Sequence, residues 1–229
     1  MISVVIPTLN AEEGLSACLA ALVPAAIEGM VREVIVVDGG SSDRTLKIVE
    51  QAGAELLHAA PGRGEQLALG AAQARQPWLL FLHADTILEP GWEREVGAVI
   101  ERVDSGRRAP TAAAFRFTLD DVGLWPRMVE VGVAVRCALF RLPYGDQGLL
   151  IPRSLYQQAG GYSRLPLMED VDLTRRIGRR QMMVLRARVV TSAARYRRDG
   201  YLRRSARNLS CLALFFLRVP PRVIARLYG

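Results

Sequence analysis

Three groups of acidic residues lie where carboxylates commonly do chemistry, directly after apolar segments or at the expected start of a helix. Asp38 follows the apolar run 34–37, and Asp85 ends His83-Ala84-Asp85 after the run 78–82. The carboxylate of Asp85 is a hard oxygen ligand of the kind that Mg²⁺ or Mn²⁺ prefers, and the oxygens of a bound diphosphate can supply other ligands. We therefore predict a divalent-metal site centred on Asp85.

The third acidic group, Met168-Glu169-Asp170-Val171-Asp172, puts three carboxylates within four residues. The helix dipole favours acids at a helix start, so a purely structural role is one interpretation. The catalytic interpretation is that one of them, preferably Asp170 with Glu169 beside it, removes the proton from an acceptor hydroxyl. We expect Gly145, Asp146 and Gln147 on the acceptor side, although the segment 145–148 also fits a simple turn.

One further segment could contact a phosphate-bearing ligand. Gly62-Arg63-Gly64 precedes an alanine-rich helix over 65–74; its glycines permit close backbone approach, and Arg63 offers a planar donor to a base or phosphate. A flexible loop with a solvated arginine would have the same composition. We interpret His83 as a packed, hydrogen-bonded histidine rather than a metal ligand.

The order of the apolar runs predicts the scaffold that brings these residues together. Runs 3–6, 34–37 and 78–82 are each followed by a loop and a segment of helical periodicity, and Asn10 with Glu13 resembles a capping box. Strands that are apolar on both faces and alternate with helices form a parallel sheet covered on both sides. Ligands bind outside the carboxyl ends of such strands, so Thr8, Asn10, Asp38 and Asp85 should face one crevice.

The second half of the chain is less regular. We predict strands at 113–117 and 149–151, an amphipathic helix over 122–142 and a helix over 169–180. The length of 229 residues fits one α/β domain, which we place at 1–198 with a ligand-binding half at 1–104 and an acceptor half at 105–198. Three widely spaced cysteines and the absence of a leader pattern predict a cytoplasmic protein without disulfides.

Residues 199–229 are predicted to form a basic, amphipathic helical tail. Residues 175–229 hold 15 arginines and one acid, a net charge of +14, so the total of +7 leaves −7 for residues 1–174. Leu209, Leu212, Ala213 and Phe216 fall at helical spacing, so this face could lie on an anionic membrane, such as the inner face of the cell membrane, or pack on the body or on a second subunit. We favour packing, and Arg195, Arg197 and Arg198 could close over a bound diphosphate.

Five segments, in this order, resemble the family 2 glycosyltransferases of the GT-A fold. They are 5–12 (VIPTLNAE), 36–45 (VVDGGSSDRT), 62–64 (GRG), 83–85 (HAD) and 169–170 (ED). The resemblance covers roughly residues 1–190 and implies a GT-A domain that transfers a sugar, with inversion, from a nucleoside diphosphate sugar, with a UDP-sugar favoured. It implies that Asp85 binds the metal, that Asp38 lies near the nucleotide base, and that Asp170 is the catalytic base. The donor-side residues implied by the matching segments are Pro7, Thr8, Asn10, Glu12, Asp38, Gly62, Arg63, His83 and Ala84.

The sequence departs from the family at His83, because the metal motif of the family usually reads Asp-x-Asp. The compact length, the His-Ala-Asp form, the segment 145–148 and the arginine-rich end also resemble a small bacterial subgroup named for arsenosugar biosynthesis, which implies a small-molecule acceptor. The acceptor is expected to be a small molecule or a lipid.

Two other classes of protein share some of these features. A nucleotidyltransferase has a similar sheet, but it normally carries an early glycine-rich loop with basic residues, and Pro7-Thr8-Leu9-Asn10 has neither. A non-catalytic basic-tailed protein that binds nucleic acid would need aromatic residues interleaved with the arginines, and only Tyr196 and Tyr201 lie near them. We therefore expect no nucleic-acid partner.

Overall fold

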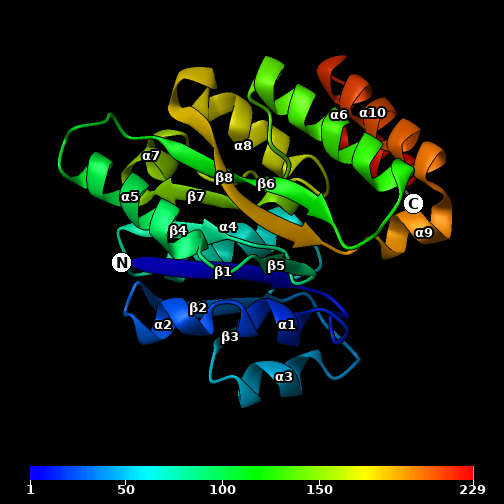
Figure 1. Cartoon of the computed structure of the whole chain (residues 1–229). Coiled ribbons are helices and arrows are strands. Elements are labelled where there is room, and N and C mark those ends of the chain that lie inside the picture. Colours follow the sequence, from blue (N-terminus) through cyan, green and yellow to red (C-terminus); the bar gives the residue numbers. More distant parts are fainter. Residues whose placement is uncertain (229) are drawn as a thin grey trace.

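The computed structural model describes residues 1–228, which form one mixed, mostly parallel sheet with helices on both of its faces (Figure 1). The eight strands lie in the order β3-β2-β1-β4-β7-β6-β8-β5. Strands β1, β2, β3 and β4 run parallel to one another, as do β6 and β8, whereas β7 is antiparallel to β4 and β6, and β5 is antiparallel to β8. The predicted α/β architecture is confirmed.

The predicted strands form because each apolar run can be buried on both faces of the sheet. Every residue of β1 (Ile2–Thr8) is buried, and so is every residue of β4 (Trp78–Phe81) and β7 (Leu149–Pro152). The other two predicted strands are β2 (Val31–Asp38) and β6 (Ala112–Leu119). Three strands were not predicted: β3 (Glu55–His58), β5 (Thr86–Leu88) and β8 (Met182–Thr191).

Two apolar clusters lie on opposite faces of the sheet. One face is covered by α1 (Leu15–Ala20), α2 (Val23–Ile27), α3 (Thr45–Gln51) and α5 (Trp92–Asp104). The other face is covered by α4 (Arg63–Gln73), α7 (Arg153–Gln158) and α8 (Glu169–Ile177). This arrangement fixes the amino ends of α4 and α8 near the carboxyl ends of the central strands.

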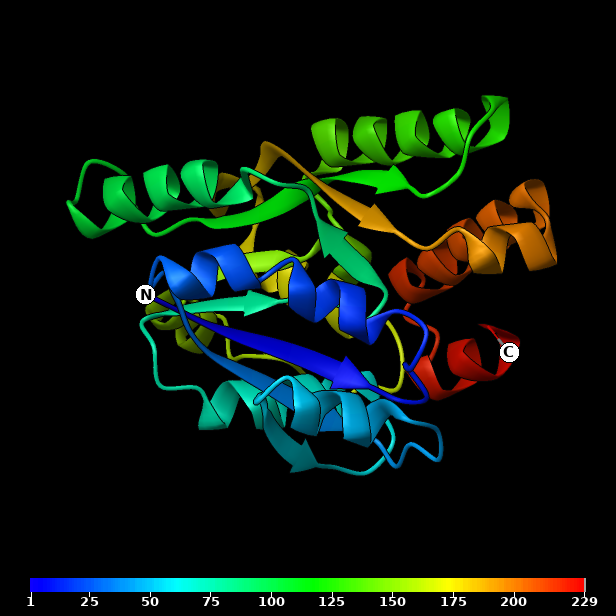
Figure 2. The ribbon, with the colours of Figure 1, turned by 60° about the horizontal axis from the view of Figure 1, so that its bottom comes forward.

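The remaining helices are one that packs on β6 and three that follow β8 in the chain. They are α6 (Leu124–Phe140), α9 (Ala194–Asp199), α10 (Tyr201–Phe216) and α11 (Pro221–Tyr228). Helices α6 and α10 are in contact and lie beside each other in Figure 1, and Figure 2 shows the amino terminus and α11 at opposite ends of the molecule. Buried Cys211 and Ile224 pack against Met168 and Val171, so the tail is docked on the start of α8.

The capping box predicted for Asn10 and Glu13 is wrong. Helix α1 begins at Leu15, and its N-cap, Gly14, makes no side-chain capping bond. Asn10 has a left-handed backbone (φ 51°), and its side-chain oxygen accepts a hydrogen bond from the Ser42 amide at 2.9 Å. The side chain therefore bridges two loops instead of starting the helix.

Gly70 offers a test of the packing between α4 and the sheet. A Cβ atom at Gly70 would lie 2.4 Å from Val5 Cγ1 and 3.0 Å from Val37 Cγ2. We expect Gly70→Ala to lower the free energy of unfolding by about 1–3 kcal/mol, because overpacking costs more than the gain in helix propensity. Urea denaturation measures this difference. Gly132→Ala, on α6 where a Cβ atom would have no neighbour within 4 Å, is the control and should be neutral or stabilising by up to about 1 kcal/mol. Equal stabilisation by both substitutions would contradict this view of the interface.

Candidate active site

The loops after β1 and β2 are joined by hydrogen bonds that centre on Asp38. Its carboxylate is buried and accepts hydrogen bonds from the Thr8 hydroxyl (3.1 Å), the Ser41 hydroxyl (2.5 Å) and the Gly40 and Ser41 amides (2.8 Å each). Burial raises the pKa of Asp38, but the bonds from Ser41, Gly40 and Thr8 outweigh it and hold the pKa below its usual value. Asp38 is therefore a fixed anion that holds the turn 38–41.

The same two loops are tied together further along the chain. The Glu12 amide donates to the Asp43 carboxylate at 3.0 Å, and the Glu12 carboxylate accepts from the backbone and side chain of Arg44. Behind them, the buried Gln66 amide donates to the carbonyl oxygens of Thr8 and Val37, both at 2.7 Å. The predicted residues Thr8, Asn10, Glu12 and Asp38 thus form one connected rim beside Pro7, at the carboxyl ends of β1 and β2.

A cavity of about 110 Å³ lies at the carboxyl ends of the central strands and collects the other charged residues that were predicted from sequence. Six of the predicted site residues line it: Arg63, His83, Asp85, Asp146, Glu169 and Asp170. The residues of the rim described above do not line it, and neither do Gly62, Ala84, Gly145 and Gln147. The predicted crevice is therefore divided into this cavity and the neighbouring rim.

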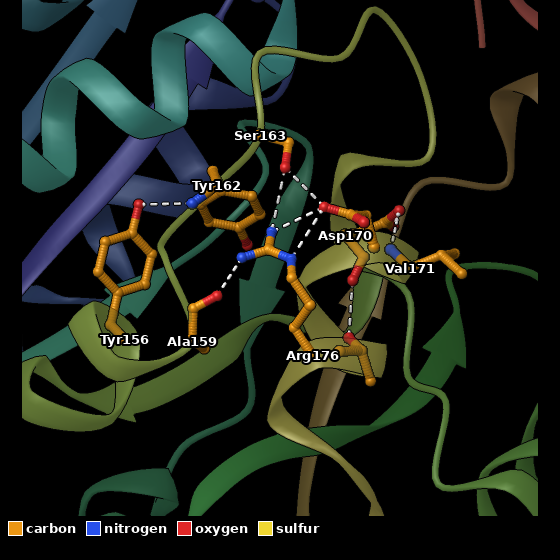
Figure 3. Close-up of polar contacts among 9 residues, drawn as sticks. Tyr156, Ala159, Tyr162, Ser163, Asp170, Val171 and Arg176 are labelled. Carbon is orange, nitrogen blue, oxygen red and sulfur yellow. Dashed lines mark hydrogen bonds and ion pairs between the residues drawn. The ribbon is translucent and has the colours of Figure 1, made fainter. Parts of the chain in front are cut away.

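Helix α8 brings the two adjacent acids, Glu169 and Asp170, to the wall of the cavity. The Asp170 carboxylate accepts hydrogen bonds from the Gly145 amide at 2.6 Å and, as Figure 3 shows, from the Val171 amide at 2.7 Å. Arg176, on the next turn, bonds to the Ala159 carbonyl and the Ser163 hydroxyl and pairs with Asp172, so it anchors this helix to the loop before it (Figure 3). The amides of Gly145 and Val171 orient the Asp170 carboxylate, whereas the Asp172 carboxylate bonds to Ser163 and Arg176.

Two buried carboxylate oxygens in the cavity wall have no hydrogen-bond partner among residues 1–228. They are Oε2 of Glu169 and Oδ1 of Asp146. Burial, and then the neighbouring Asp170 carboxylate, raise the pKa of Glu169 to about 7. Burial likewise raises the pKa of Asp146 to about 6, although Arg136 opposes the shift. Buried polar atoms without partners are uncommon in folded proteins, so these oxygens are available to a ligand.

The cations at the cavity come from distant parts of the chain. Arg63 begins α4, Arg195 lies in α9, and Arg204 is a buried residue of α10 that bonds to Asp199 at 3.3 Å and to the Tyr228 hydroxyl. Burial and the charges of Arg63 and Arg195 hold the pKa of His83 well below its usual value. His83 is therefore neutral near pH 7 and offers one ring nitrogen as donor and the other as acceptor.

Asp85 is half-buried at the cavity, and its carboxylate accepts no hydrogen bond from residues 1–228. Residues 1–228 contain no group of three or more histidine, cysteine or acidic side chains arranged to hold a metal ion. A cation at Asp85 would therefore take one protein carboxylate and most of its ligands from a bound substrate. This donor set fits Mg²⁺ or Mn²⁺ with a diphosphate, since both cations prefer oxygen.

The acceptor-side prediction separates into two parts. Asp146 lines the cavity, but Gln147 is buried and structural: its amide donates to the Phe115 carbonyl at 3.0 Å and accepts from Arg136 at 3.1 Å. Gly145 lies close to both His83 and Asp170, because a Cβ atom there would lie 2.7 Å from His83 Nε2 and 3.3 Å from an Asp170 oxygen. A side chain at 145 would therefore enter the space between these two groups.

Sequence reasoning missed much of the cavity wall. Aromatic and polar residues complete it, namely Phe117, Tyr144, Thr191, Ser192, Tyr196, Asn208 and Tyr228. Phe117 and Thr191 lie on β6 and β8, and the last two lie in the tail helices. The arginine density of the tail was the one sequence signal for this wall, and of the three arginines expected near the diphosphate only Arg195 lines the cavity; Arg197 lies near Asp120 and Asp121, and Arg198 pairs with Asp199.

The mixed, mostly parallel sheet, with acids and arginines gathered at the carboxyl ends of its strands, has the architecture of the GT-A fold. The solved structures that share this fold include S. aureus TarS 1–349 (TM-score 0.63, 16% identity, covering 99% of this chain and 69% of that one). Another is glucosyl-3-phosphoglycerate synthase of Mycobacterium tuberculosis with Mn²⁺ and UDP-glucose (TM-score 0.57, 22% identity, covering 82% of this chain and 69% of that one). Residues 3–162 match glycosyl transferase family 2, and the chain belongs to this family.

Curated relatives agree with the family. An uncharacterized glycosyltransferase of Mycobacterium tuberculosis is 30% identical over 138 residues, which cover 58% of this chain and 56% of that protein. A PGL/p-HBAD biosynthesis glycosyltransferase of Mycobacterium bovis is 37% identical over 108 residues, which cover 38% of this chain and 36% of that protein. The chain thus spans about half the length, or less, of these relatives. Family membership favours the predicted glycosyltransferase over the nucleotidyltransferase and nucleic-acid-binding alternatives.

The raised pKa of Glu169 predicts a pH-dependent stability. Because the folded state favours the protonated acid, this contribution is fully present below about pH 4.5 and is lost as the pH rises through about 7. We expect Glu169→Gln to reduce the fall in unfolding free energy between pH 5 and pH 8, measured by urea denaturation without ligand. The exposed Glu28, changed to Gln, is the control. An unchanged pH dependence in Glu169→Gln would show that Glu169 ionises without cost in the folded protein.

Proposed function

We propose that this protein is a metal-dependent, inverting glycosyltransferase that moves a sugar from a nucleoside diphosphate sugar, with a UDP-sugar favoured, to an acceptor hydroxyl. One observation carries the proposal: Asp85, Arg63 and the Glu169-Asp170 pair, from three distant segments, line one cavity at the carboxyl ends of the strands. The structures of relatives with UDP-glucose and Mn²⁺, or with UDP-GlcNAc, support the choice of donor.

The donor would lie across the rim and the cavity. The rim built around Asp38, with Pro7, Thr8, Asn10 and Glu12, would contact the nucleoside, and the diphosphate would reach Arg63 and Asp85. Asp85 would hold Mg²⁺ or Mn²⁺, which neutralises negative charge on a leaving diphosphate. The guanidinium groups of Arg63 and Arg195 face the same space and add fixed positive charge there.

The neutral imidazole of His83 takes the place of an acid in this proposal. An uncharged ring next to a diphosphate avoids the repulsion that a carboxylate would add, and it can donate one hydrogen bond to a ribose or phosphate oxygen. Its low pKa keeps it in that form across the neutral range. The segment 83–85 would therefore meet the diphosphate and its metal ion with one carboxylate rather than two.

Asp170 is the group proposed to remove the proton from the acceptor hydroxyl. It lines the cavity, is partly exposed, and is held by two backbone amides, so its carboxylate has a fixed direction. Glu169 is only 1% exposed, which makes it less able to meet an acceptor directly. Its proposed part is to hold a proton while Asp170 is ionised, because burial and the charge of Asp170 raise the pKa of Glu169.

The proposed acceptor is a small molecule or a lipid that carries an apolar part. Phe117, Tyr144, Tyr196 and Tyr228 line the cavity, and aromatic rings of this kind favour apolar or ring-shaped ligands. Asp146 supplies a half-buried carboxyl, with its pKa raised to about 6 by burial, that could bond to an acceptor hydroxyl. The resemblance to the arsenosugar subgroup stays a prediction of the sequence, as does the cytoplasmic location.

The metal assignment predicts the behaviour of Asp85→Asn. We expect this substitution to remove the Mn²⁺-dependent stabilisation of the protein by UDP, measured as a shift of the thermal unfolding midpoint, while the ligand-free midpoint stays unchanged. The fold should survive because Asp85 lies in a loop after β4. Glu89→Gln, outside the cavity, is the control and should keep the full shift. Equal shifts in Asp85→Asn and the parent protein would rule out Asp85 as the metal ligand.

The base assignment predicts that Asp170→Asn lowers kcat by about 10²-fold or more with little change in donor affinity, as expected when a general base is lost. Donor hydrolysis or transfer with UDP-sugars and Mn²⁺ provides the assay. Asp172→Asn is the matched control on the same helix, because its carboxylate bonds to Ser163 and Arg176 outside the cavity. If Glu169→Gln stops turnover while Asp170→Asn stays active, Glu169 is the base.

A further inference from the structure

The outer face of α6 is apolar, like the interior of a protein, although it is exposed. Its inner face packs through Val129 and Val133 on buried Phe117 and Leu119 of β6. Its outer face carries large apolar residues, each between 46% and 71% exposed: Leu124, Trp125, Met128, Val131, Val135 and Leu139. A helix at the surface of a soluble domain normally turns polar residues outward, so this face is built to meet a non-aqueous surface.

The neighbouring helix α10 repeats the pattern. Leu202, Leu209 and Phe216 are 45–67% exposed and fall seven residues apart, which places them along one side of the helix. In α11, Val223 and Leu227 are 45% and 60% exposed at a spacing of four. Helices α6, α10 and α11 therefore all leave apolar side chains uncovered within residues 1–228.

Arginines without acidic partners lie in or near the helices that carry these apolar residues. Residues 200–228 contain six arginines and no acid. Within the described chain, no carboxylate lies within 4.0 Å of the guanidinium groups of Arg141, Arg179, Arg180, Arg203, Arg218, Arg222 and Arg226. Arg179 also donates to the Leu139 carbonyl, so this charge lies at the carboxyl end of α6 itself.

The acids near α6 are already occupied by other arginines. Glu130 pairs with Arg127 at 2.6 Å, and Asp120 and Asp121 lie 3.8 and 3.5 Å from Arg197. A two-fold dimer through this surface would place the same patch against itself, so unpaired arginines would oppose one another. The occupant that complements the surface in charge and in polarity is a layer with anionic groups outside and hydrocarbon inside.

We propose that the outer face of α6, with α10, α11 and the bordering arginines, is a docking surface for an anionic lipid bilayer. Helix α6 has 17 residues and is about 25 Å long at 1.5 Å per residue, so it would lie in the plane of the interface. Among residues 1–228, no helix is long and apolar enough to cross a bilayer. The protein would bind the membrane surface through side chains rather than through a span.

Docking in this way would place the cavity next to the bilayer. Phe117, which lines the cavity, packs directly under α6, and Tyr196 contributes to both the cavity and the α6 cluster. If the transferase proposed above acts on a hydroxyl of a membrane-bound acceptor, which rests on the proposed function, its acceptor would need little displacement from the membrane. Lipid binding itself requires no catalysis, so the two proposals can fail separately.

Intrinsic fluorescence offers a direct measurement, because the chain has three tryptophans and two of them are buried. Trp78 and Trp92 are each 1% exposed, whereas Trp125 on the outer face of α6 is 46% exposed. We expect vesicles of phosphatidylcholine with about one-third phosphatidylglycerol to shift the emission to shorter wavelength and to cosediment with the full chain at low salt. Vesicles of phosphatidylcholine alone should bind at least tenfold more weakly, and 0.5 M NaCl should weaken binding further. In Trp125→Phe the shift should vanish while cosedimentation persists.

Substitutions separate the apolar and the charged parts of the surface. Val131→Gln with Val135→Gln should reduce cosedimentation at least tenfold. Val23→Gln with Ile27→Gln, which removes apolar residues 51% and 80% exposed on distant α2, is the matched control and should bind normally. Arg222→Gln with Arg226→Gln should also weaken binding about tenfold or more, since each arginine near an anionic surface contributes about fivefold.

Three outcomes would overturn the proposal, provided that thermal unfolding shows each variant to be folded. The first is no binding of the full chain to the anionic vesicles at low salt. The second is equal loss of binding in the α6 and α2 variants. The third is a dimer, measured by light scattering, that Val131→Gln with Val135→Gln converts to monomer, which would assign this face to a second copy of the chain.

Discussion

Balancing charge in a confined space is the constraint on which the arrangement of this molecule depends. Four carboxylates and three guanidinium groups line a cavity of about 110 Å³. Two unit charges 4 Å apart interact with about 4 kcal/mol near a protein surface, so the acids could not all ionise there without nearby cations. Glu169 and Asp146 show the remaining imbalance, because burial and Asp170 raise the pKa values of both. The arginines therefore contribute to the fold as well as to the proposed ligand recognition, and elements that lie far apart in sequence must dock for the cavity to exist.

The rim around Asp38 stabilises a buried carboxylate in a different way, through hydrogen bonds alone. Here one buried carboxylate receives four hydrogen bonds, which favour its ionised form and lower its pKa without any cation. An anion that is already satisfied adds rigidity, and it holds the loops after β1 and β2 in one conformation. The two acidic regions thus differ in a way that suits them to different tasks, since the rim is fixed while the cavity keeps unbonded oxygens for a ligand.

The parts of the fold that could be predicted from sequence are those governed by local patterns. Apolar runs such as 3–6 and 78–82 are buried on both faces, so the strands and the residues at their carboxyl ends follow directly. Strand β8 was missed because Arg186 and Arg188 interrupt its apolar character, and both are exposed while Leu185 and Val189 are buried. Strand β3 lies at the edge of the sheet and is only partly buried, which weakens its signal further. Helix α6 was predicted as an amphipathic helix, but its sequence does not show which of its faces packs on the sheet.

The candidate site is harder to predict from sequence than the strands, because one of its walls comes from the tail. Arg204 and Arg207 lie near Asp199 and turn inward, and Arg204 is only 5% exposed at the cavity. Arg203 stands beside Arg204 in sequence, yet it is exposed and has no carboxylate within 4.0 Å in residues 1–228. Helical geometry sends adjacent side chains about 100° apart, so one arginine-rich segment can supply counter-charge to buried acids and present positive charge to the surroundings at the same time. A count of arginines reveals the total charge of the tail, but only the packing of Cys211 and Ile224 against α8 decides which arginines serve which side.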